Sequence, residues 1–115
     1  MVQIGDVLRN KPTYNLEKLK KQLKKSDTRH ITETAYDAAV ELGYISYEDI
    51  AEAIILNITP HDFKKTMPSE SIPGTFQDVY KKTLNGVKLY IKLQENPKGR
   101  GVVIQFKKDT SVGGK

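Results

Sequence analysis

The chain has 115 residues and a mass of 13.0 kDa, with 19 basic and 14 acidic residues, a net charge of +5 and no cysteine. This length predicts a single domain over residues 1–115, with residues 1–12 and 109–115 expected to be flexible. The lack of cysteine excludes a disulfide framework, a thiolate zinc site and a cysteine nucleophile. Because no apolar run approaches ~18 residues and no signal peptide is evident, we expect a cytoplasmic protein without a membrane segment.

The charge is distributed unevenly along the chain. Residues 1–29 carry eight basic and three acidic residues, and residues 30–57 carry six acidic residues and no lysine or arginine. Residues 58–115 carry eleven basic and five acidic residues. An anionic partner is therefore expected to bind the C-terminal part of the chain.

The N-terminal half is expected to be helical. Residues 15–25 show apolar positions at helical spacing, and residues 32–42 form a second candidate that is capped by Thr32. A third helix is expected to begin near Ser46. Thr59 followed by proline predicts a short fourth helix over residues 59–66.

The C-terminal half is expected to form three antiparallel strands. The candidates are residues 76–83, 87–94 and 102–108, separated by the turn residues Asn85-Gly86 and by the loop 96–101. Helices followed by such a meander define an α+β fold, with N-terminal helices packed on one face of a small C-terminal antiparallel sheet.

Alternation in these strands predicts one apolar and one polar sheet face. The apolar positions are Val87, Leu89, Ile91 and Leu93, followed by Val102, Ile104 and Phe106. The polar positions are Lys88, Tyr90, Lys92, Gln94, Gln105 and Lys107, with Gln77 and Lys81 as further members from the first strand. The polar face is expected to carry no carboxylate before Glu95. Cations around an aromatic ring are typical of nucleic-acid binding, and an ordinary solvated face is the alternative.

Metal chemistry has little support in the sequence. The two histidines, His30 and His61, lie on different predicted elements and show no metal-binding spacing. Acidic residues that could gather Mg²⁺ occur on the second and third predicted helices: Asp37, Glu41, Glu48, Asp49 and Glu52. A charged, solvated helix surface is the better interpretation, so we predict neither a metal nor a cofactor.

Four segments of the sequence resemble the MqsR family, mRNA-cleaving toxins of type II toxin–antitoxin systems with a RelE-like fold. The segments are 61–67, 76–81, 89–92 and 102–107, and the resemblance extends from about Pro12 to Lys108. Its most specific part is the pattern Asp-Phe-x-Lys-x-Met, followed by Gln-Asp-Val-Tyr. The resemblance implies an mRNA substrate and an MqsA-like antitoxin partner with a zinc-binding part and a helix-turn-helix part.

The resemblance also implies a set of site residues. The family's proposed active-site positions fall on Lys65, Gln77, Tyr90 and Lys107, with Lys65 expected on the short fourth helix. Further substrate contacts are expected from Lys81, Lys88, Lys92 and Gln105. Lys81 stands where the family commonly has arginine, which keeps the charge but loses the bidentate geometry.

The leading hypothesis is a sequence-selective, metal-independent endoribonuclease toxin. RNA supplies its own nucleophile, the 2′-hydroxyl, so the protein needs cations beside the phosphate and groups that transfer protons. Tyr90 or a desolvated lysine is expected to transfer protons, since neighbouring cations can lower the pKa of either group. The alternatives are a non-catalytic RNA- or DNA-binding module that uses the same face, and a protein-interaction domain with an acidic partner.

Overall fold

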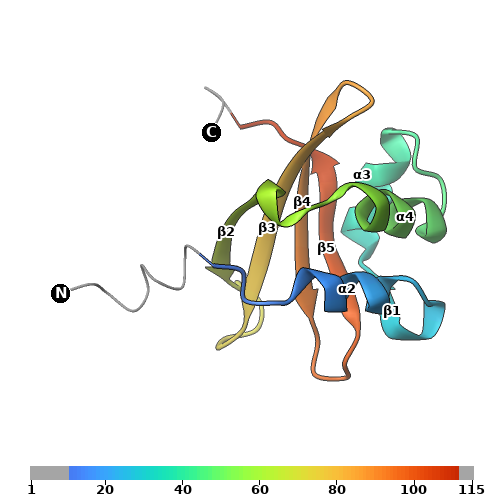
Figure 1. The fold of residues 1–115 in the computed structure, drawn as a ribbon. Helices are drawn as coiled ribbons and strands as arrows, with labels where there is room; N and C mark the ends of the chain where they lie inside the picture. Colours follow the sequence, from blue (N-terminus) through green and yellow to red (C-terminus); the bar gives the residue numbers. More distant parts are fainter. Residues whose placement is uncertain (1–10, 112–115) are drawn as a thin grey trace.

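The computed structural model describes residues 11–111, and within this range the chain forms an α+β fold with three α-helices and a five-stranded sheet (Figure 1). The helices are α2 (Leu16–Leu23), α3 (Glu33–Glu41) and α4 (Tyr47–Asn57). The predicted flexibility of residues 1–10 and 112–115 concerns segments outside the described residues.

Each of the three helices begins at a side-chain cap. The side chains of Asn15, Thr32 and Ser46 each accept a hydrogen bond from the backbone N–H three residues further along the chain. Such caps satisfy N–H groups that have no partner inside the helix. The three long helices predicted from the sequence are therefore confirmed, each within a few residues of its expected bounds.

The sheet is larger than the predicted meander. Its strands are β1 (Arg29–Ile31), β2 (Phe63–Pro68), β3 (Phe76–Leu84), β4 (Val87–Glu95) and β5 (Gly101–Lys108). Their order is β1-β5-β4-β3-β2, in which β1 pairs parallel with β5 and all other pairs are antiparallel. The sheet is therefore mixed, and the expectation of a purely antiparallel sheet was wrong at its β1 edge.

The predicted fourth helix is replaced by a single 3₁₀ turn and a strand. The turn spans Pro60–Asp62, and the Asp62 carboxylate accepts hydrogen bonds from the backbone N–H of Thr59 at 2.7 Å and from its hydroxyl at 3.0 Å. The following residues pair with β3 instead of continuing the turn. Lys65 consequently lies on β2, because long-range strand pairing overrides the local helix-start signal.

Two β-bulges decide which side chains share a face. In β2, Phe63 is paired with Tyr80 and Lys65 with Val79, which leaves Lys64 as an extra residue. A bulge of this kind moves the following residues to the opposite face relative to regular alternation. The bulge therefore lets Phe63 pack on the Tyr80 ring, at a centroid distance of 5.7 Å, while Lys65 lies on the other side of the sheet.

The second bulge corrects the predicted alternation in β5. Leu93 pairs with Val103 and Lys92 with Gln105, so Ile104 is the extra residue between them. Val103 is fully buried in the core, whereas Val102 is paired with Gln94. The expectation that Val102 and Ile104 face the helices was therefore wrong.

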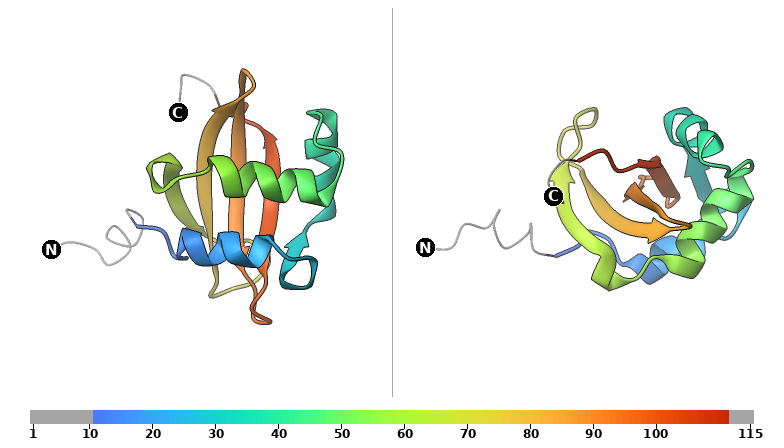
Figure 2. Two further views of the ribbon diagram at one scale, coloured as in Figure 1. Left: turned by 45° about the vertical axis from the view of Figure 1, so that its right-hand side comes forward. Right: turned by 90° about the horizontal axis from the view of Figure 1, so that it is seen from above.

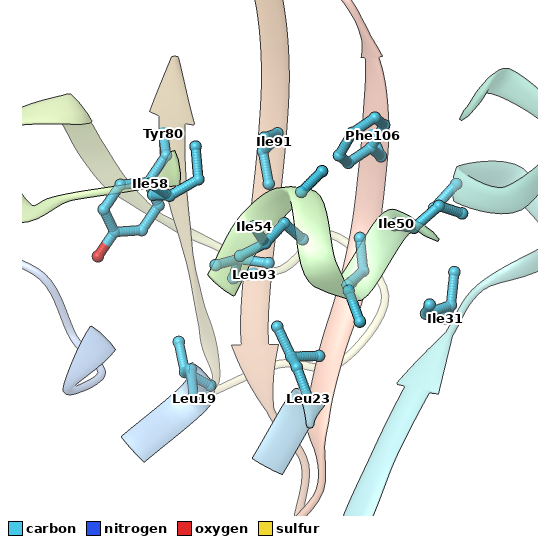
Figure 3. Close-up of a cluster of buried hydrophobic side chains, with 14 of the residues drawn as sticks. Leu19, Leu23, Ile31, Ile50, Ile54, Ile58, Tyr80, Ile91, Leu93 and Phe106 are labelled. Carbon is cyan, nitrogen blue, oxygen red and sulfur yellow. The ribbon is translucent and has the colours of Figure 1, made fainter. Parts of the chain in front are cut away.

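The core lies between the sheet and the helices. Figure 2 shows α2 and α4 side by side across one face of the curved sheet, with α3 near its β1 edge. In Figure 3 the leucines of α2 and the isoleucines of α4 point toward the strands. The fully buried members include Leu19, Leu23, Ile50, Ile54, Ile91, Leu93 and Phe106. Within residues 11–111, α2 and α4 therefore cover one sheet face and leave the opposite face uncovered.

Candidate functional site

The sheet face that α2 and α4 leave uncovered gathers the predicted site residues. We call it the cationic face, and its members are Lys65, Gln77, Lys81, Lys88, Tyr90, Lys92, Gln105 and Lys107. The strand register places Tyr90 between Lys81 and Lys107, and Lys92 next to Gln105. The register therefore assembles residues from four strands on one surface.

Tyr90 lies at the centre of three lysine side chains. The Nζ atoms of Lys81, Lys92 and Lys107 lie 5.8, 5.8 and 5.3 Å from the centroid of its ring. These distances suit cation–π attraction between an ammonium group and the face of an aromatic ring. The Tyr90 ring thus lies among three ammonium groups.

The environment of Tyr90 favours its protonated form. Burial raises the pKa of the Tyr90 hydroxyl above its usual 10.0, and the negative charge of Asp109 raises it further. The sequence-based expectation was that neighbouring cations would lower this pKa. For Tyr90 that expectation was wrong, because desolvation and a carboxylate outweigh the lysines.

Lys92 shows the opposite shift. Burial lowers the pKa of its ammonium group from the usual 10.5, and the charges of Lys107 and Lys65 lower it further, while Glu70 acts in the opposite direction. Both burial and neighbouring like charges disfavour an ammonium ion. The neutral form of Lys92 is therefore more accessible than that of an isolated, solvated lysine.

Gln77 is held in place by a second glutamine. Its Nε2 donates a hydrogen bond of 3.1 Å to Oε1 of Gln94, and both side chains are buried. Strand alternation predicts Gln94 on the polar face, but no role for this residue was expected from the sequence. Gln94 could have been identified as a site residue from its position four residues after Tyr90, because residues two and four apart on a strand share a face.

Asp109 brings a carboxylate onto the cationic face that strand alternation did not predict. Its Oδ2 atom lies 3.2 Å from Nζ of Lys81 and 3.7 Å from Nζ of Lys88, and its side chain is only 3% exposed. Alternation within the strands predicts no carboxylate on this face before Glu95, and Asp109 adds one from the segment that follows β5. The contact of Asp109 with Lys81 and Lys88 could not be predicted from strand alternation, because Asp109 follows the last strand.

The acidic residues of α3 and α4 do not form a metal site in the structure. Among residues 11–111, no three histidine, aspartate or glutamate side chains gather closely enough to hold a metal ion. Within the same residues, no helix combines the length and the apolar character needed to cross a membrane.

The fold is that of a small α+β protein whose uncovered sheet face gathers lysines around one aromatic ring. The model of one protein family, described as the motility quorum-sensing regulator, toxin of MqsA, matches residues 11–108. The chain therefore belongs to this family and is the toxin of a toxin–antitoxin pair, with an antitoxin as its partner. No curated protein sequence matches the chain.

Proposed function

We propose that this toxin is a sequence-selective, metal-independent mRNA endoribonuclease that cleaves by attack of a 2′-hydroxyl on the adjacent phosphate. The single observation that carries the proposal is the Tyr90 ring with three lysine Nζ atoms within 5.8 Å of its centroid. Cations fixed around a proton donor meet the electrostatic and proton-transfer needs of this reaction. The family match supports the toxin role.

Two lysines stabilise the negative charge of the reacting phosphate. Lys65 and Lys107 lie on β2 and β5, on opposite sides of Lys92 on β4. In the proposed complex their ammonium groups contact the non-bridging oxygens. Preorganised charges of this kind stabilise a phosphorane-like transition state without reorganisation. Gln77, fixed by Gln94, orients the sugar or base by hydrogen bonding.

Proton transfer is divided between Tyr90 and Lys92. Lys92, with its lowered pKa, accepts the proton of the 2′-hydroxyl, and Tyr90, with its raised pKa, donates a proton to the departing 5′-oxygen. The O–P bond to the 5′-oxygen breaks as the 2′-oxygen bonds to phosphorus. The products are a 2′,3′-cyclic phosphate and a 5′-hydroxyl.

The partner follows from the family. An MqsA-like antitoxin, with a zinc-binding part and a helix-turn-helix part, inhibits the toxin in the cytoplasm. Expression of the toxin alone arrests growth, and co-expression of the antitoxin relieves the arrest.

The decisive experiment incubates the purified protein with single-stranded RNA in EDTA. Cleavage with a cyclic 2′,3′-phosphate end and a 5′-hydroxyl end, mapped by primer extension to a short sequence motif, is the expected result. A strict requirement for Mg²⁺ would exclude the proposed mechanism. Salt-sensitive binding that leaves the RNA intact would identify a non-catalytic binding module instead.

Matched variants separate the site from the rest of the surface. We expect Lys107→Ala and Tyr90→Phe to slow cleavage by about 10²-fold or more, with little effect on the thermal unfolding midpoint. The controls are Lys64→Ala, which removes the extra residue's charge on β2, and Tyr47→Phe on an exposed part of α4. Equal loss of activity in the controls would contradict the assignment.

A further inference from the structure

The segment after β5 folds back onto the cationic face through Asp109. Its backbone N–H donates a hydrogen bond of 2.7 Å to the carbonyl oxygen of Lys88, which continues the pairing of β4 beyond the end of β5. The Oδ1 atom of Asp109 accepts hydrogen bonds from the backbone N–H of Ser111 at 3.1 Å and from its hydroxyl at 2.6 Å. The backbone and Ser111 therefore fix the orientation of the carboxylate.

The fixed carboxylate neutralises one end of the cationic face. Oδ2 of Asp109 contacts the ammonium groups of Lys81 and Lys88, and the side chain of Lys81 is only 10% exposed. The hydrogen bonds from Ser111, together with the contact to Lys81, lower the pKa of Asp109 to about 2. Asp109 is therefore ionised throughout the physiological pH range.

In the part of the chain that the structure describes, no carboxylate pairs with Lys65, Lys92 or Lys107 as Asp109 pairs with Lys81 and Lys88. The positive charges of Lys107 and Lys65 lower the pKa of the Lys92 ammonium group. Lys92 and Lys107 also share the Tyr90 ring, with their Nζ atoms 5.8 and 5.3 Å from its centroid. The negative charge of Glu70 acts in the opposite direction and raises the pKa of Lys92. A phosphate is attracted more strongly by a cluster of mutually repelling cations than by lysines that are already paired with a carboxylate.

We propose that Asp109 is a positioning residue: by engaging Lys81 and Lys88 it holds them back from the RNA backbone and directs the reacting phosphate to Lys65, Lys92 and Lys107. This inference rests on the proposed ribonuclease function. It gives Lys81 and Lys88 a different role from the substrate contacts predicted from the sequence. Lys81, held by Asp109, stays beside the Tyr90 ring and acts on the substrate only through Tyr90.

The test is Asp109→Asn, with binding and cleavage measured separately. Binding uses a single-stranded RNA whose 2′-O-methyl groups prevent cleavage, titrated between about 50 and 200 mM salt. The freed lysines should steepen the salt dependence of binding by about 0.7 per additional phosphate contact. On cleavable RNA we expect KM to fall and kcat to fall by about tenfold or more, because phosphates now also bind in an unproductive position.

Two further variants make the result specific. Asp49→Asn makes the same chemical change on α4, on the helix side of the sheet, and should leave the salt dependence and kcat unchanged. Ser111→Ala keeps every charge but removes the hydroxyl that donates to Asp109 Oδ1 at 2.6 Å and accepts from Nζ of Lys81 at 3.0 Å, so both groups are held less tightly. It should shift KM and kcat in the same directions as Asp109→Asn, by less. Thermal unfolding of each variant identifies loss of folding.

The outcomes are distinguishable from failure of the ribonuclease proposal. If Asp109→Asn matches the wild type in salt dependence, KM and kcat, Asp109 has no positioning role, whereas cleavage by the wild type still supports the enzyme. If the variant raises KM and unfolds at lower temperature, Asp109 is a structural contact and the inference is wrong. If the wild type neither binds nor cleaves RNA, both proposals fail together.

Discussion

Tyr90 and Lys92 have pKa shifts in opposite directions although they lie two residues apart on one strand. Desolvation is the largest cause for both residues, and it acts against the charged form in each case. A phenol is neutral when protonated and an amine is neutral when deprotonated. The same burial therefore produces a proton donor at one position and a proton acceptor at the other, which is the arrangement that acid–base catalysis requires.

This pair predicts the pH dependence of cleavage. The reaction needs neutral Lys92, whose pKa lies below 10.5, and protonated Tyr90, whose pKa lies above 10.0. Activity should therefore rise with pH as Lys92 loses its proton, and it should fall only after Tyr90 ionises. Measurements of kcat/KM against pH, corrected for RNA hydrolysis with an inactive variant, provide the check.

Lys92→Arg tests the assignment of the base. Arginine keeps the positive charge but cannot lose its proton, so the rising part of the pH profile should disappear and cleavage should slow by about 10²-fold. Lys88→Arg, at a neighbouring lysine of the same strand face, is the control. Full activity of Lys92→Arg would show that Lys92 only binds the phosphate.

At the scale of elements, the side chain of one threonine links the start of α3 to β5. The Thr32 hydroxyl accepts a hydrogen bond of 3.1 Å from the N–H of Ala35 and donates one of 2.9 Å to the carbonyl oxygen of Ile104. The first bond caps α3, and the second holds the bulge residue of β5. A single side chain thus joins the start of a helix to the irregularity that aligns Gln105 and Lys107 on the cationic face.

Removing this hydroxyl should destabilise the protein. Thr32→Val keeps the shape of the side chain but leaves two hydrogen-bonding groups without a partner, so we expect the free energy of unfolding to fall by about 1 to 2 kcal/mol. Urea denaturation measures the change. Thr34→Val, at an exposed position on the same helix, should change stability by less than about 0.5 kcal/mol.

The second element-scale contact joins the N-terminal segment to β3. The buried Asp78 carboxylate accepts hydrogen bonds from the backbone N–H groups of Thr13, at 3.0 Å, and Tyr14, at 2.9 Å. Because both carboxylate oxygens are used, Asp78→Ala should lower the free energy of unfolding by about 2 kcal/mol or more. If Asp78→Ala lowers the free energy of unfolding no more than Asp27→Ala, a change at an exposed aspartate, this role for Asp78 is contradicted.

At the scale of the whole molecule, two lysine-rich surfaces lie on opposite sides of the sheet. The helix α2 carries Lys18, Lys20 and Lys21, and it packs on the face opposite the cationic face (Figure 2). Net charge alone does not distinguish the two surfaces. They differ in that only the cationic face places its lysines around an aromatic ring and beside buried amide groups.

Two double variants with the same net charge test which surface binds RNA. Lys92→Gln with Lys107→Gln should reduce the salt dependence of RNA binding by about 0.7 per lysine. Lys20→Gln with Lys21→Gln should leave it almost unchanged. If the α2 variant reduces the salt dependence as much as the variant on the sheet does, RNA binds the helices and the assignment of the site to the sheet is wrong.

Sequence patterns predicted the features that depend on local chemistry. Helix caps such as Thr32 and the strict alternation of β4 were readable because they involve neighbouring residues. The turn at Asn85-Gly86 was recognised as well, and positive φ angles of 53° and 78° identify it as type I′. Most of the candidate site was thus placed on the correct strands and on the correct face.

The features that were missed depend on distant pairing. Lys65 was assigned to a helix because its strand is defined by pairing with β3 and not by its own sequence. β1 is only three residues long and exists through its parallel pairing with β5. Asp109 was overlooked because its partners, Lys81 and Lys88, are far away in the sequence.

The two bulges have a consequence for sequence alignment. A one-residue insertion or deletion inside a regular strand turns every later side chain to the wrong face, so related proteins seldom differ in strand length. At Lys64 and Ile104 this restriction is relaxed, since loss of the extra residue leaves Lys65 opposite Val79 and Gln105 opposite Lys92. We therefore expect single-residue gaps within the strands of homologous toxins to fall at these two positions.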